Sequence, residues 1–93
     1  MSNNTKIFTI AGGFYFYGEQ VDAPEGYIAL NNYAMFGGFS GGKGLPGVAR
    51  GDKEAKVTLD RFEEGEIGYF PLSSCYGIHP SIDLYKFKGT TIR

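Results

Sequence analysis

The sequence predicts an all-β or β-dominated α+β domain, built as a single antiparallel sheet or small barrel of about six short strands. Two observations carry this prediction. Apolar residues recur with a period of two far more often than with the 3.6-residue period of a helix. In addition, Gly, Pro or Asn interrupts every segment that is long enough to form an amphipathic helix. At 93 residues the chain has the size of one domain, residues 1–93, with a single core.

The first two strands form the clearest pair. Residues 6–11, "KIFTIA", are rich in β-branched and aromatic side chains, and residues 14–21, "FYFYGEQV", begin with alternating Phe and Tyr. Gly12 and Gly13 between them can both take a positive φ, which predicts a two-residue hairpin turn. If the phenylalanines face the core, Tyr15 and Tyr17 lie on the outer face of this hairpin.

Similar patterns predict the remaining strand segments, which are residues 26–36, 55–62, 67–70 and 81–92. In residues 26–36, the Asn31–Asn32 pair indicates a turn between two strands, with a short helix as the alternative. In residues 81–92, the apolar positions change face midway, which predicts a bulge or a strand that is buried on both sides.

Charge, cysteine content and hydropathy limit the partners. Nine Lys and Arg against ten Asp and Glu, with an isoelectric point near 5.7, argue against direct binding of DNA or RNA, although net charge says nothing about its distribution. The single cysteine, Cys75, excludes an internal disulfide framework and suits a reducing cytoplasm. No apolar run approaches the ~20 residues of a membrane helix, and no signal peptide is recognisable. We therefore expect a soluble cytoplasmic protein without a membrane partner, with residues 1–5 disordered.

The glycine-rich stretch "FGGFSGGKGLPG" resembles a phosphate-binding loop in part. It matches the pattern G-x-x-x-x-G-K up to the final position, where Gly44 replaces the Ser or Thr that binds magnesium. That motif also needs a helix after the lysine, and Pro46 between glycines is expected to block one. We predict that residues 37–47 form a flexible loop instead.

Three interpretations of this loop remain open. It is a mobile connection between strands, or a docking loop from which Phe36, Phe39 and Leu45 project toward a partner. In the third, the N–H groups of Gly41–Gly44, assisted by Lys43, form a nest that binds a small anion or nucleotide.

The other polar residues do not assemble a recognisable catalytic or metal site. Cys75 and His79 provide two ligands where a structural zinc site needs four, and a nucleophilic pair needs a third, orienting group. We expect Cys75 in the core, His79 in a turn, and no catalytic residue, metal or cofactor. The run of acids that includes Glu63 and Glu64 predicts a solvated turn or a surface that complements a basic partner.

Tyrosine is the strongest indication of binding. Seven tyrosines in a chain of this length are dense, and protein interfaces favour this side chain. Sheets that stack nucleic-acid bases interleave their aromatics with Lys and Arg, whereas Gly, Glu and Gln follow the first tyrosines here. A protein surface is therefore the expected target. The predicted contact residues are Tyr15, Tyr17, Phe39, Lys43, Glu63 and Glu64.

In its small size, its acidic turn "DRFEEGE", its hairpin "GGFYFYGE" and its loop "FGGFSGGKG", the chain resembles the small phage-encoded counter-defence proteins, above all the anti-CRISPR inhibitors. The resemblance implies a non-catalytic inhibitor that blocks a host CRISPR–Cas surveillance complex or nuclease by stoichiometric contact. The near-neutral charge departs from the strongly acidic DNA mimics of that group and favours steric blocking. The alternatives are an anion- or nucleotide-binding sponge that uses the glycine loop, and a phage structural subunit that forms homo-oligomers through its strand edges.

Overall fold

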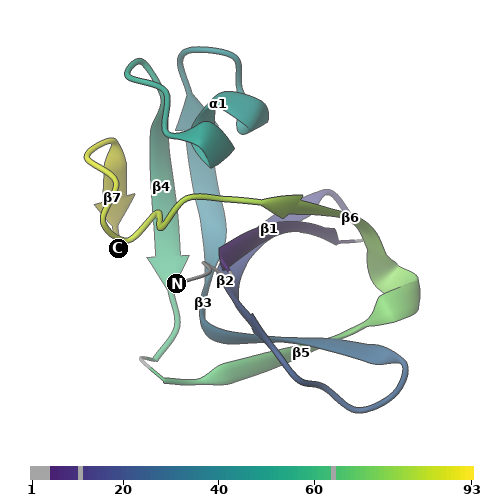
Figure 1. The fold of residues 1–93 in the computed structure, drawn as a ribbon. Coiled ribbons are helices and arrows are strands. Elements are labelled where there is room, and N and C mark those ends of the chain that lie inside the picture. Colours follow the sequence, from purple (N-terminus) through teal and green to yellow (C-terminus); the bar gives the residue numbers. More distant parts are fainter. Residues whose placement is uncertain (1–4, 11, 64) are drawn as a thin grey trace.

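The computed structural model describes residues 5–10, 12–63 and 65–93. It contains one mixed sheet in the order β6-β1-β2-β3-β4-β7, with β5 pairing to β3 off this path (Figure 1). The β-dominated fold and the single sheet are confirmed; the sheet is mixed because β7 runs parallel to β4. The elements are β1 (Thr5–Ile10), β2 (Phe14–Val21), β3 (Tyr27–Ser40), α1 (Leu45–Arg50), β4 (Lys56–Arg61), β5 (Ile67–Pro71), the 3₁₀ helix η1 (Leu72–Ser74), β6 (Cys75–Pro80) and β7 (Thr90–Ile92).

β3 is one long strand, so the turn predicted at Asn31–Asn32 is wrong. Asn32 instead takes a positive φ of 54°, which Asn tolerates better than most residues, and the strand continues past it. Its backbone N–H donates to the Glu66 carbonyl at 2.9 Å, and its side-chain oxygen accepts a bond from Arg61 at 2.7 Å. Before this point the edge of β3 pairs with β5, and after it the same edge pairs with β4.

The sheet carries an apolar cluster on each face. β5, β3, β2, β1 and β6 curve round one cluster, which we call the barrel-side core (Figure 1). α1 and the segment before β7 contribute to the cluster on the other face, the helix-side core. The barrel-side core consists of Phe8, Ile10, Ile28 and Leu30. The helix-side core consists of Ile7, Tyr17, Ala34, Val48, Ala55, Val57, Leu59 and Leu84.

Because both faces are covered, the predicted outward orientation of Tyr15 and Tyr17 is wrong. Tyr17 has no exposed surface, and Tyr15 is half-buried; both pack in the helix-side core. Phe16 packs against the barrel-side core, while Phe14 is 53% exposed. The Phe16 and Tyr17 side chains of β2 thus point into two different cores, rather than one into a core and the other into solvent.

Residues 81–89 form turns, and only Thr90–Ile92 of the long strand predicted there is extended. Asp83 explains the difference, because its carboxylate accepts the N–H of Tyr85 at 3.1 Å and its carbonyl accepts the N–H of Lys86 at 3.1 Å. Such local bonds from Asp to the backbone favour a turn over a strand.

The glycine-rich loop is shorter than predicted, since only Gly41–Gly44 lie between β3 and α1. Pro46 does not block the helix, because it lies in the first turn, where its missing N–H has no intrahelical partner to lose. Gly51 ends the helix in the left-handed conformation. Of the residues predicted to be disordered, 1–4 lie outside the described residues, and Thr5 begins β1.

Candidate functional site

The structure does not bring the six predicted contact residues onto one surface. Lys43 and Glu63 are exposed but flank opposite ends of the β3–β4 pair, in which Ser40 lies opposite Lys56 and Ala34 opposite Arg61. Phe39 is half-buried and packs edge-on against Tyr15, with the ring centroids 5.7 Å apart. Tyr17 is buried, and Glu64 lies outside the described residues.

The buried hydroxyl of Tyr17 has a structural partner on each side. It accepts the backbone N–H of Leu84 at 2.8 Å and donates to the Asp83 carboxylate at 3.3 Å. Burial, the largest cause, raises the pKa of Tyr17 well above its ordinary value, and the nearby Asp83 charge raises the same pKa further. The phenol therefore stays protonated at neutral pH and fixes residues 81–89, which we call the turn segment, to the sheet.

Tyr85 extends the same polar cluster. Its hydroxyl donates to the Asn32 carbonyl at 2.6 Å, and the Arg61 guanidinium lies 4.8 Å from its ring centroid. Burial raises the pKa of Tyr85, and the Arg61 charge partly offsets that effect. These contacts connect β3, β4 and the turn segment, so we assign the cluster to stability.

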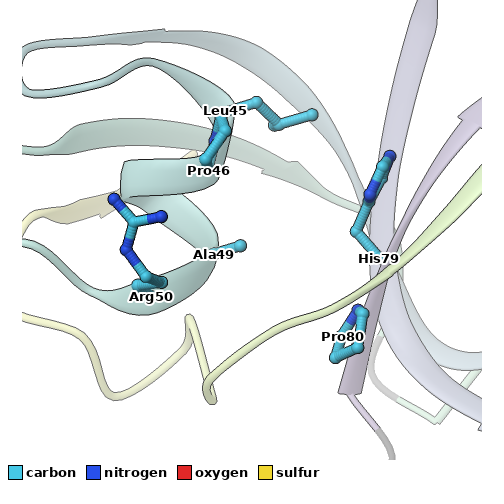
Figure 2. A pocket seen from close by; sticks show the side chains of 6 residues that line it. All are labelled: Leu45, Pro46, Ala49, Arg50, His79 and Pro80. Carbon is cyan, nitrogen blue, oxygen red and sulfur yellow. The ribbon is translucent and has the colours of Figure 1, made fainter.

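A pocket of about 250 Å³ lies between α1 and β6 (Figure 2). Leu45 and Ala49 of the helix face His79 and Pro80 of the strand, while the Arg50 guanidinium points away from the histidine (Figure 2). The volume is smaller than the ~300–1,000 Å³ of most ligand sites. The lining has no carboxylate, cysteine or hydroxyl group that could act with His79 as a nucleophile or orienting group.

Cys75 and His79 cannot act as a pair, because they face opposite sides of the sheet. His79 lies opposite Ile7 of the helix-side core, whereas Cys75 lies opposite Ile10 and packs against the barrel-side core. A register shift in the β1–β6 ladder produces this arrangement. His79 is thus on an edge strand rather than in the predicted turn. Within residues 5–10, 12–63 and 65–93, no three His, Cys, Asp or Glu side chains are grouped as metal ligands would be.

An exposed aromatic surface lies on β3 and β5, and sequence reasoning missed it. Tyr27 is 48% exposed and Tyr69 56% exposed, and together with Pro24 they line a depression of about 280 Å³. The β3–β5 register places Ile67, 42% exposed, on the same face as these tyrosines. We call Pro24, Tyr27, Ile67 and Tyr69 the tyrosine face. The alternation of Ile67 and Tyr69 across a small Gly in a short strand was the available signal.

A second missed feature is a groove of about 680 Å³ beside the start of β4. Its charge comes entirely from lysine, and no Asp or Glu belongs to its described lining. The short sequences "DKEAK" and "YKFKG" carried the signal, but they are far apart in the chain and the net charge conceals them. We call this feature the lysine groove; it is lined by Gly51, Lys53, Lys56, Lys86, Phe87, Lys88 and Gly89.

Comparison with known proteins matches no family model, no curated protein and no solved structure. None of the helices in the described ranges is long and apolar enough to cross a membrane. The surfaces above are therefore the observations from which a function can be argued.

Proposed function

We propose that this chain is a non-catalytic binding protein that acts by stoichiometric contact with a host protein complex, and that the tyrosine face is its main contact. The observation that carries the proposal is the pair Tyr27 and Tyr69, each about half exposed beside Pro24. Exposed tyrosines offer a large, rigid, amphipathic area at low entropic cost, and they dominate the energetics of many protein interfaces.

The position of this face at a sheet edge supports the same proposal. Among the described residues, β5 pairs with β3 alone, so its other side presents backbone hydrogen-bonding groups to a partner. Five residues from Ile67 to Pro71 suffice to align an added strand, and the proline limits how far such pairing extends. Side-chain contact through the tyrosines and backbone contact through the edge would act together.

For the partner, we propose a CRISPR–Cas surveillance complex or nuclease that a phage inhibitor blocks sterically. The support is the resemblance in size and local sequence to small counter-defence proteins, together with the exposed acidic turn at Glu63 and Glu66. Complexes that bind nucleic acid present basic surfaces, and an acidic turn would increase the rate of encounter with them.

The test is a plasmid-interference assay in cells that each carry one type of active CRISPR–Cas system, with the chain expressed in trans. We expect transformation to be restored in one system, and the purified effector to be fully inhibited at one chain per complex. Tyr27→Ser/Tyr69→Ser should abolish the effect. Tyr76→Ser provides the control, because Tyr76 is 74% exposed on β6, at the other edge of the curved half of the sheet.

Two outcomes contradict different parts of the proposal. If interference continues in every system, the counter-defence assignment is wrong. If inhibition occurs but the double tyrosine variant inhibits as well as the Tyr76 control, the tyrosine face is not the contact.

A further inference from the structure

The lysine groove is assembled by the parallel pairing of β4 with β7. Lys53 precedes β4 and Lys56 is its first residue, while Lys86 and Lys88 lie in the turn segment that leads to β7. Val57 lies opposite Thr90, and its N–H donates to the Gly89 carbonyl at 3.0 Å, which fixes the two segments side by side. The side chains of all four lysines are exposed, and within the described part of the chain none of their ammonium groups forms an ion pair or hydrogen bond.

An aromatic ring lies among these charges. Phe87 is half-buried, packs against the helix-side core and also lines the groove. Glycines flank it, since a Cβ at Gly89 would lie 2.7 Å from the ring and a Cβ at Gly51 would lie 3.6 Å from it. Two positions without side chains thus leave room beside the ring. The interleaving of lysine and aromatic side chains that is missing around Tyr15 and Tyr17 is present at Lys86–Lys88.

The lysine groove and the acidic turn lie at opposite ends of β4; of the two acids that flank Lys53 in sequence, Asp52 pairs with Arg50 and Glu54 is exposed outside the groove lining. The groove lies at the start of this strand, and the acidic turn at Glu63 and Glu66 follows its end, about 20 Å away at the rise of an extended chain. This distance exceeds the ~8 Å over which charges act at physiological salt. A net charge of −1 is therefore compatible with a strongly positive local surface.

We propose that the lysine groove binds a single strand of nucleic acid, with the four ammonium groups on backbone phosphates and Phe87 stacked on a base. Lysine is suited to phosphate as a point charge, without the planar fork by which arginine reads bases. A positively charged groove that is lined by an aromatic ring is the general means of binding single strands without sequence preference. In a duplex the base faces are already stacked, and an acidic peptide would leave Phe87 without a partner.

The number of lysines determines how strongly the affinity for a single strand depends on salt concentration. For single strands the logarithm of the association constant falls with the logarithm of salt concentration with a slope of about −0.7 per phosphate contact, or about −2.8 for four contacts. Between 50 and 200 mM salt the affinity should fall about 50-fold. With two lysines removed, the slope should be about −1.4 and the fall about sevenfold.

Fluorescence polarisation of a labelled 12-nucleotide oligo-dT tests the proposal with the 93-residue chain. We expect salt-dependent binding with the slope above, and Lys86→Ala/Lys88→Ala should halve that slope. Lys6→Ala/Lys43→Ala makes the same change in net charge outside the groove and should leave the slope unchanged. Phe87→Leu should weaken oligo-dT binding at least about fivefold, while binding of inorganic polyphosphate stays the same.

Three results would overturn the proposal: no binding at 50 mM salt, equal slopes for the two double-lysine variants, or equal affinity for oligo-dT, a duplex of the same length and a poly-glutamate peptide. Circular dichroism of every variant establishes that it is folded. The groove and the tyrosine face share no residue, so either site can fail its test without affecting the other.

Discussion

The substitution Tyr17→Phe tests most directly whether the phenol points into the helix-side core. It removes only the hydroxyl oxygen, which accepts the buried N–H of Leu84 at 2.8 Å and donates to Asp83 at 3.3 Å. Leu84 has no exposed surface, so water cannot replace the lost acceptor without disturbing the packing. A buried donor without a partner costs about 1–3 kcal/mol, and we expect the free energy of unfolding to fall by about 2 kcal/mol.

Urea denaturation followed by circular dichroism measures this change. The midpoint should fall by about 1–2 M with an unchanged m-value, and the melting temperature should fall by about 8–16 °C for a domain of this size. Tyr69→Phe is the matched control, because Tyr69 is 56% exposed, and its stability should change by less than about 0.5 kcal/mol. Equal stability of the two variants would refute the inward orientation of Tyr17.

Three further predictions concern backbone fit, pH and the turn segment. Gly41→Ala should lower the free energy of unfolding by about 2–4 kcal/mol, because φ is +81° and a Cβ would collide with the Glu54 carbonyl. Gly38→Ala is the control, since Gly38 has open space and no positive φ, and it should be neutral or slightly stabilising. Chemical denaturation of both variants measures the difference. Burial raises the pKa of Tyr17 in the folded state, so the stability that the protonated phenol contributes is complete below about pH 10. Above that pH the free energy of unfolding should fall by up to about 1.4 kcal/mol per pH unit. Thermal melts over a pH series should show this decline, and Tyr17→Phe should flatten it. Leu84→Ala should cost about 2–5 kcal/mol in the same denaturation assay, because the side chain is fully buried; a surface-like cost would show that the turn segment does not cover the core.

Local patterns were sufficient to predict the hairpin and β4. Gly12 and Gly13 both take a positive φ as expected, but Ile10 lies opposite Phe14 and the Ile10 carbonyl accepts the N–H of Gly13 at 3.1 Å, so the connection is one residue longer than the predicted two-residue turn. Val57 and Leu59 alternate inward along β4, because one face of this strand packs on the helix-side core. In both places the period of two and the turn chemistry point to the same structure.

The orientation of β2 could not be predicted, because it depends on contacts that are distant in sequence. Period-two alternation shows that Phe and Tyr face opposite ways, but it does not show which face is covered. The partners that bury Tyr17 are Asp83 and Leu84, 66 and 67 residues further along the chain. The turn around Asp83 covers the face of β2 that carries the tyrosines, and nothing in the sequence of β2 itself indicates this cover.

Tertiary context also decided the lysine groove and the tyrosine face. Lys56 and Lys88 are neighbours only because β7 pairs in parallel with β4, a pairing that needs a long crossover and that hairpin reasoning does not anticipate. Tyr27 and Tyr69 share a face only because β5 pairs with the part of β3 that precedes Asn32. In each case the residue types were visible in the sequence and their proximity was not.

The central claim is that this protein acts through the outer surface of its sheet and not through a pocket. Hydrogen–deuterium exchange of the chain in complex with the effector that we propose it inhibits tests this claim most directly. We predict that protection on binding is concentrated in residues 24–29 and 67–71, which carry the tyrosine face and the β5 edge. Protection concentrated instead in residues 45–50 and 79–80, around the pocket between α1 and β6, would contradict it.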